Sequence, residues 1–169
     1  MLRISFLFIA CIFTAVEVTG QADFSIVRLD GIGPVRVGMT LSELNKALHT
    51  SYSKPTDPDE QTCTYVELPR QPGIGLMILN GFVARVDVNN ASTHTAEGIH
   101  NGDSEAHALQ VYGKRLEVEP HHYEPENGHY LTLLSNDRKH GIRFETEDGK
   151  IMRYHAGTTE AIALVEGCS

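Results

Sequence analysis

The chain is short of positive charge, with 14 lysine and arginine residues against 22 aspartate and glutamate residues and a formal net charge of −8. Because nucleic-acid backbones are bound through clustered cations, this balance argues against nucleic acid as a partner. After residue 22 the sequence also lacks an apolar run near the ~18 residues that a membrane-spanning helix needs. We therefore expect no transmembrane segment beyond that point.

A recognisable catalytic signature is missing as well. The sequence contains no nucleophile elbow, no helical metal-binding pair and no phosphate-binding glycine loop, so it predicts neither an enzyme nor a cofactor. The composition is otherwise ordinary, since 41% hydrophobic and 21% charged residues are typical of a globular protein. A mostly disordered chain is excluded on the same ground.

The first 22 residues have the pattern of a secretory signal peptide. A cation is followed by an apolar stretch from Ile4 to Val16, and the small residues Gly20 and Ala22 precede the expected cleavage point. We therefore predict an exported protein, periplasmic or secreted, whose mature chain starts at Asp23 and has the size of one ordinary domain. The alternative is a lipoprotein acylated at Cys11.

Cysteines are scarce, and only Cys63 and Cys168 lie beyond the predicted signal peptide. In an oxidising exported compartment, an even pair of cysteines is more often a disulfide than a metal site or a catalytic pair. We therefore predict a Cys63–Cys168 disulfide, which would join the end of the chain to a strand in its first half. The alternative is a pair of buried free thiols.

The sequence contains an internal repeat. In each copy an Asx-Gly turn is followed by an arginine four residues after the glycine: Asn80-Gly81 precedes Arg85, and Asp148-Gly149 precedes Arg153. Three further pairs match in the same order, namely Gly73-Ile74 with Gly141-Ile142, Tyr65–Leu68 with Tyr130–Leu133, and Gly38–Leu44 with Gly102–Ala108. We therefore predict a signal peptide at 1–22 and two repeats, at 23–92 and 93–169, packed as one unit.

Each repeat has the pattern of a helix followed by strands. Thr40 and Glu43 form a capping box at the start of the first helix, and Asp103 or Ser104 caps a second helix that Gly113 ends. The predicted fold class is α+β, with two tandem repeats, each a short helix followed by an antiparallel β meander. Because one such half is too small to be stable alone, we expect the two halves to share a core or a continuous sheet.

The Asx-Gly turns predict two β-hairpins, because a type I′ turn needs positive φ at both central residues. Alternation along the returning strands then assigns each side chain to one face of the sheet. The predicted core-facing residues are Ala84, Val86, Val88, Met152 and Tyr154. The opposite face is predicted to carry Arg85, Asp87, Arg153 and His155.

The stretch Val37–Leu44 resembles the Gly-Met-Thr signature of SmpA-type outer-membrane assembly lipoproteins, and the duplicated layout resembles that of the β-lactamase inhibitory proteins. The phrases Gly31–Gly38, Gly102–Glu105 and Val165–Ser169 are similar to phrases in a group of small exported bacterial proteins. These resemblances imply export and a tandem helix-plus-sheet layout, but no activity. β-Lactamase inhibition is not implied, because no inhibitory contact residue matches.

One strand is predicted to need a cover on its second face. The segment 74–79 is apolar on both faces, so Met77 is covered either by the other half of the chain or by a partner. Tyr65 and Tyr130 fall on this same second face, which could place them beside Arg85 and Arg153, and tyrosine and arginine are favoured at interfaces. We therefore predict a non-enzymatic exported binding protein that presents a sheet face to a macromolecular partner, of inhibitor or envelope-assembly type. The predicted partner-binding residues are Tyr65, Met77, Arg85, Tyr130 and Arg153.

The histidine-rich segment 120–130 supports an alternative function, a small-ligand binder for carbohydrate or metal. His121, His122 and His129 are candidate metal ligands, because imidazole and carboxylate groups together can hold zinc. Tyrosines on the same face could instead stack a sugar ring. A tight helical metal motif is missing, however, so the favoured interpretation of the segment is a solvated loop between two strands, and no metal is assigned.

Overall fold

A computed structural model describes residues 23–168 of the chain. The predicted signal peptide at residues 1–22 and the lipoprotein alternative at Cys11 lie outside the described residues. Between residues 23 and 168, no helix is both long enough and apolar enough to cross a bilayer.

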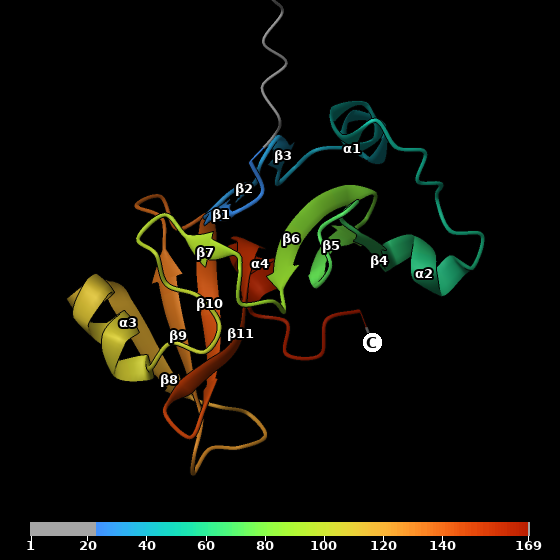
Figure 1. Cartoon of the computed structure of the whole chain (residues 1–169). Helices are drawn as coiled ribbons and strands as arrows, with labels where there is room; N and C mark the ends of the chain where they lie inside the picture. Colours follow the sequence, from blue (N-terminus) through green and yellow to red (C-terminus); the bar gives the residue numbers. More distant parts are fainter. Residues whose placement is uncertain (1–22, 169) are drawn as a thin grey trace, which may run out of the picture.

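The strands form two sheets (Figure 1). The larger sheet has the order β4-β5-β6-β11-β10-β9-β8, with bounds Cys63–Glu67, Ile74–Leu79, Phe82–Val88, Lys150–Thr158, His140–Glu147, His129–Leu134 and Leu116–Pro120. The smaller sheet has the order β3-β2-β1-β7, with bounds Val35–Arg36, Gly31–Ile32, Ile26–Arg28 and His94–Thr95. Neighbouring strands of the larger sheet pair antiparallel.

Short helices flank these sheets, and both predicted helix starts are confirmed. The helices are α1 Leu41–Leu48, α2 Pro58–Thr62, α3 Glu105–Tyr112 and α4 Thr159–Ile162. At α1, the capping box forms between the Thr40 and Glu43 backbone and side chains. At α3, Ser104 rather than Asp103 is the cap, and the helix ends at Gly113 with a φ of 57°.

The two predicted hairpins are confirmed as β5–β6 and β10–β11. The central residues have positive φ, 52° and 84° at Asn80-Gly81 and 48° and 72° at Asp148-Gly149. The returning strands β6 and β11 pair with each other, so one sheet continues from β4 to β8. The α+β class and the continuous sheet are therefore confirmed, while the smaller sheet was not predicted.

Each hairpin contains a β-bulge, which simple alternation does not predict. The register shifts after Met77 in the β5–β6 pair and after Glu145 in the β10–β11 pair. Because a bulge places an extra residue on one strand, Ala84 and Met152 have no partner across the hairpin and the alternation changes face there.

The predicted position of Ala84 on the same face as Val86 and Val88 is therefore wrong, and so is the predicted burial of Met152. Val83 and Ile151 enter the core in their place, each only 1% exposed. Ala84 packs on the opposite face of the sheet, and Met152 is 55% exposed. The remaining core predictions, Val86, Val88 and Tyr154, are confirmed.

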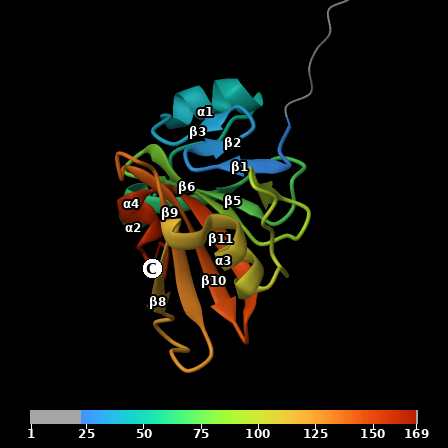
Figure 2. The same cartoon turned by 90° about the vertical axis from the view of Figure 1, so that its left-hand side faces the viewer.

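One face of the larger sheet carries the main hydrophobic core. Figure 2 shows the smaller sheet and α1 at one end of the molecule and α3 in front of β10 and β11. Val27 from β1, Leu44 from α1 and Ala108 from α3 are fully buried in this core. The ring of Tyr112, also from α3, lies 5.9 Å from that of Phe144 on β10. The core face is thus closed by the chain itself.

The opposite face of the larger sheet, called the outer face below, has a different cover. Helix α4 lies on it, with Ala161 packed against Met77 and Ala84. The residues after α4, 163–168, are called the C-terminal tail. The predicted disulfide is present, with the Cα atoms of Cys63 and Cys168 5.3 Å apart, and it fastens the end of the tail to β4.

The disulfide generates a stability prediction. Because it closes a loop with a sequence separation of 105 residues, the Cys63→Ser/Cys168→Ser variant is expected to lose about 2–5 kcal/mol of unfolding free energy, measured by urea denaturation. The intact mass of the wild-type protein should rise by about 2 Da on reduction, as two thiol hydrogens are gained. An unchanged mass and unchanged stability would contradict the bond.

Candidate functional site

Two rows of side chains cross the outer face at right angles to the strands. The first row, on β4, β5 and β6, consists of Tyr65, Met77 and Arg85, which are successive partners in the register. The second row, on β9, β10 and β11, consists of Tyr130, Glu145 and Arg153. Each predicted tyrosine therefore shares a row with the predicted arginine of its own half.

In the first row, the Arg85 guanidinium fastens the C-terminal segment to the sheet. Its Nε and one terminal nitrogen hold the Asp87 carboxylate at 3.0 and 2.8 Å, and the latter nitrogen also donates to the Tyr65 hydroxyl at 2.7 Å. The other terminal nitrogen donates to the carbonyls of Ala161 and Leu164 at 2.9 and 3.1 Å. All three guanidinium nitrogens thus have hydrogen-bond acceptors, although Arg85 is only 4% exposed.

In the second row, Glu145 is a charged group near the centre of a largely buried network. Arg153 donates to one of its oxygens from two nitrogens, each at 2.8 Å. Burial alone would raise the pKa of the Glu145 carboxyl. The hydrogen bond and charge of Arg153, together with His155 and His121, outweigh this effect and lower the pKa. The resulting pKa lies below the ordinary value, so Glu145 is ionised at neutral pH.

His155 lies between the two rows and is neutral. Its Nε2 donates to the Ile162 carbonyl at 3.0 Å, and its Nδ1 is 3.6 Å from Glu145. Burial, with the nearby positive charge of Arg85, lowers the pKa of His155 to about 4. The imidazole therefore lies between the Arg85–Asp87 and Arg153–Glu145 ion pairs without adding a charge at pH 7.

The loop formed by residues 121–128 covers the other end of the outer face. The His121 ring packs at a tilt against Tyr130 with centroids 4.6 Å apart, and the Arg143 guanidinium lies over the Tyr130 ring at 5.0 Å from its centroid. The Tyr123 hydroxyl donates to the Glu166 carboxylate, which joins this loop to the tail. The guanidinium over the Tyr130 ring is therefore that of Arg143, while Arg153 shares a row with Tyr130 on the other side of Glu145.

The five predicted partner-binding residues differ in exposure. Met77 is 0%, Arg85 4% and Tyr130 6% exposed, because α4, the tail and the 121–128 loop cover them. The cover that Met77 was predicted to need is thus supplied by the second half of the chain. Tyr65 is 41% exposed, and the Arg153 side chain is 56% exposed. A partner can reach these two residues in the described structure.

Tyr65 and Arg153 are on the rim of a pocket of about 280 Å³ between the tail and the sheet. Gly75 lies at its floor, in register between Glu67 and Asp87. The lining is mostly polar, and it includes the Arg85–Asp87 and Arg153–Glu145 ion pairs. The accessible part of the outer face is therefore a hollow with a tyrosine on one rim and an arginine on another.

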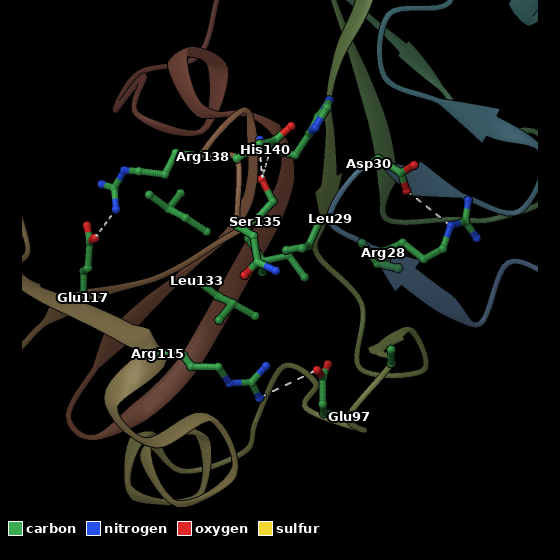
Figure 3. A pocket seen from close by; sticks show the side chains of 16 residues that line it. Arg28, Leu29, Asp30, Glu97, Arg115, Glu117, Leu133, Ser135, Arg138 and His140 are labelled. Carbon is green, nitrogen blue, oxygen red and sulfur yellow. Dashed lines mark hydrogen bonds and ion pairs between the residues drawn. The ribbon is translucent and has the colours of Figure 1, made fainter.

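A larger hollow, of about 860 Å³, lies away from the outer face, between the smaller sheet and β8–β10 (Figure 3). Leu29 and Leu133 line the middle of this hollow. Three ion pairs also contribute to its lining: Arg28–Asp30, Arg115–Glu97 and Arg138–Glu117. Each arginine of its lining is thus paired with a carboxylate. Exposed pairs of this kind are worth about 0–1 kcal/mol and give little orientation to a ligand.

The chain matches no family model, no curated protein and no solved structure. The resemblances drawn from Val37–Leu44 and from the repeated layout stay predictions.

Residues 121–128 of the histidine-rich segment form a loop between β8 and β9, as its favoured interpretation predicted, but His129 and Tyr130 lie on β9. The His121 side chain is largely buried and not solvated. Its histidines have separate partners: His121 contacts Glu145, His122 packs edge-on against Tyr123, and the Nδ1 of His129 is 3.0 Å from a Glu105 oxygen. Among residues 23–168, no three histidine, cysteine or acidic side chains are grouped so as to hold a metal. The metal and carbohydrate alternative stays a prediction without a described ligand set.

Asp87 and His155 were placed on the correct face but given no role by the sequence, and Glu145 was given no role either. Asp87, Glu145 and His155 alternate with buried apolar residues, which is the ordinary pattern of a solvent-exposed strand face. Their burial depends on α4 and the tail, and neither element has a sequence signal that predicts where it packs. The tail residue Glu166 was missed for the same reason.

The Arg85 network generates a second prediction. Replacing Arg85 with methionine leaves the Asp87 carboxylate and two carbonyls without their donor, so we expect a loss of about 3–5 kcal/mol in unfolding free energy by urea denaturation. The matched control is Arg138→Met, whose exposed pair with Glu117 should cost no more than about 1 kcal/mol. Equal small losses in the two variants would show that Arg85 does not fasten the tail.

His155 generates a third, pH-dependent prediction. Its pKa is about 4 in the folded chain against 6.5 for an ordinary histidine, so below pH 6.5 the unfolded chain takes up a proton that the folded chain does not. Stability is therefore complete above about pH 6.5 and is lost as the pH falls towards 4. Between pH 7.5 and 5, wild-type protein should lose about 2 kcal/mol more than His155→Gln in parallel urea titrations. Identical pH profiles would refute a neutral buried His155.

Proposed function

We propose that the chain is a non-enzymatic exported binding protein that presents the outer face of its larger sheet to a macromolecular partner. Export is supported by the signal-like sequence at residues 1–22 and by the Cys63–Cys168 disulfide, a bond typical of periplasmic or secreted proteins. An inhibitor or an envelope-assembly factor is the kind of protein that this description fits.

The observation that carries the proposal is a set of four exposed side chains: Tyr65 and Arg153 line the outer-face pocket, Tyr123 contacts the lining residue Glu166, and Met152 directly precedes Arg153 on β11. Tyr65 is 41% exposed, Tyr123 53%, Met152 55% and the Arg153 side chain 56%. We call these four residues the outer patch. Tyrosine, methionine and arginine are enriched at protein interfaces, so side chains of these types indicate a surface suited to a partner.

The fixed charges beneath the outer patch support the same conclusion. The ion pairs of Arg85 and Glu145 hold the tail and the sheet in one arrangement, and the Tyr123–Glu166 contact holds the 121–128 loop against the tail. A surface held in this way loses little conformational freedom on binding, and preorganisation of this kind favours affinity.

The proposal includes the tandem repeat, with one half at 23–92 and the other at 93–169. Support comes from matched backbone contacts at the helix starts. Gly38 donates to Val83, and Val83 donates back to Met39. In the second half, Gly102 donates to Ile151, and Ile151 donates back to Asp103. The Asx-Gly turns and the unpaired residues Ala84 and Met152 also occupy equivalent places.

The repeat gives the outer face its composition. Because each copy contributes one row with a tyrosine at one end and an arginine at the other, the duplicated sheet has two such rows on one surface. Met77 in the first copy corresponds to Glu145 in the second, so the first row is apolar at its centre and the second is charged. The two copies therefore offer a partner two chemically different surfaces.

An affinity enrichment tests the proposal. Tagged mature protein is incubated with the exported fraction of its source, and the bound proteins are quantified by mass spectrometry. The variant Tyr65→Ala/Met152→Ala removes two large groups of the outer patch, and truncating two such anchors commonly costs at least tenfold in affinity. We expect a partner that wild-type protein enriches and this variant enriches at least tenfold less.

The matched control is Leu109→Ala/Val118→Ala, which removes two apolar groups of similar exposure, 37% and 49%, outside the outer patch. The control should enrich the partner as wild type does, and all three proteins should melt within a few degrees of one another. A partner that all three enrich equally, or no partner at all with wild type, would overturn the proposal.

A further inference from the structure

The outer-face pocket contains a glycine that the backbone does not require. Of the described glycines, only Gly75, Gly128, Gly141 and Gly157 lack positive φ. At Gly128, Gly141 and Gly157, an added Cβ would lie 2.2–2.7 Å from other atoms, so close packing explains these three. At Gly75 the nearest atom would be 3.7 Å away, on the Tyr65 ring, which is an ordinary contact.

Neither backbone conformation nor close packing therefore explains why a glycine stands at position 75. A glycine inside a strand weakens the strand, and such a glycine often marks a place where another group approaches the backbone closely. Gly75 lies on β5 between Glu67 of β4 and Asp87 of β6, and all three line the pocket. The effect of the missing side chain is to keep the pocket floor open.

The charges of the lining indicate what the pocket can take. Arg85 is balanced by Asp87 and Arg153 by Glu145, each with a nitrogen–oxygen distance of 2.8 Å. The two remaining carboxylates of the lining, Glu67 and Glu166, have no ion-pair partner within residues 23–168. His155 is neutral at pH 7, so the lining as a whole is negative.

Size and shape restrict the occupant further. A volume of about 280 Å³ falls just below the range of ~300–1,000 Å³ that is usual for drug-sized ligands, so the pocket suits a single long side chain. The half-exposed Tyr65 ring stands at its rim, and an aromatic face attracts a cation. The net charge of the chain, −8, attracts a basic partner as well.

We propose that this pocket receives one arginine or lysine side chain of the protein partner, with the cation between Glu67 and Glu166 and the stem over Gly75. This inference rests on the proposed function and adds the chemistry of the partner. Glu67 is the specificity-determining residue, because it is the lining carboxylate whose side chain has no hydrogen bond or ion pair to any residue from 23 to 168.

The test uses N-acetyl-arginine N-methylamide as a probe, followed by amide chemical shifts of the mature protein in NMR. N-acetyl-citrulline N-methylamide, which has the same shape without the charge, is the matched control ligand. We expect the arginine probe to shift amides of residues 65–75, 85–89 and 165–167, and to bind at least tenfold more tightly than the citrulline probe. Equal binding of the two probes, or shifts elsewhere, would overturn the inference.

Two variants separate pocket binding from general attraction to an acidic protein. Gly75→Leu fills the floor and should abolish the shifts, while Glu67→Gln should weaken probe binding several-fold without altering the pocket shape. Glu117→Gln, at an exposed ion pair outside this pocket, should bind the probe as wild type does. If Gly75→Leu does not fold, Glu67→Gln against Glu117→Gln decides the question alone, and equal losses in these two would refute the pocket.

The result of the arginine-probe experiment is independent of the result of the enrichment experiment. If a partner depends on Tyr65 and Met152 but the arginine probe does not bind, the outer patch remains the binding surface and the pocket inference fails. If the probe binds the pocket and no partner is enriched, the pocket stands and the proposal of a macromolecular partner fails.

Discussion

The structure of the outer face depends on one buried guanidinium. Arg85 joins three parts of the chain that are far apart in the sequence: the β4 edge through Tyr65, its own strand through Asp87, and the C-terminal segment through Ala161 and Leu164. A buried charge is tolerated only when it is paired and hydrogen-bonded, and here the guanidinium is paired with Asp87 and each of its nitrogens has an acceptor. The tail, once fastened in this way and by the disulfide, gives the Gly75 pocket its second wall.

This arrangement divides the sheet into two chemically different faces. The core face is a conventional hydrophobic interior, closed by α1, α3 and the smaller sheet. The outer face instead combines the Arg85–Asp87 and Arg153–Glu145 ion pairs with a small apolar cluster of Met77, Ala84 and Ala161. Only the part that the cover leaves open, around Tyr65 and Arg153, is available for binding, and its preorganisation follows from the ion pairs below it.

Local rules predicted the elements well because their signals are local. The Thr40 and Glu43 capping box and the Asx-Gly turns are specified by residues a few positions apart, and the Cys63–Cys168 pair follows from counting. Alternation failed at Ala84 and Met152, because a bulge is set by contacts with the preceding helix start and not by the strand itself. The burial of Glu145 and Arg85 could not be predicted from the sequence, because it depends on how the tail packs over the sheet.

The central claim is that a partner contacts the outer patch. Site-specific photo-crosslinking in the source organism tests it most directly, with benzoylphenylalanine placed at position 65 in one protein and at position 109, on the exposed side of α3, in another. We expect a covalent adduct with one partner from position 65 and none from position 109. An adduct that forms equally from both positions, or only from position 109, would contradict it.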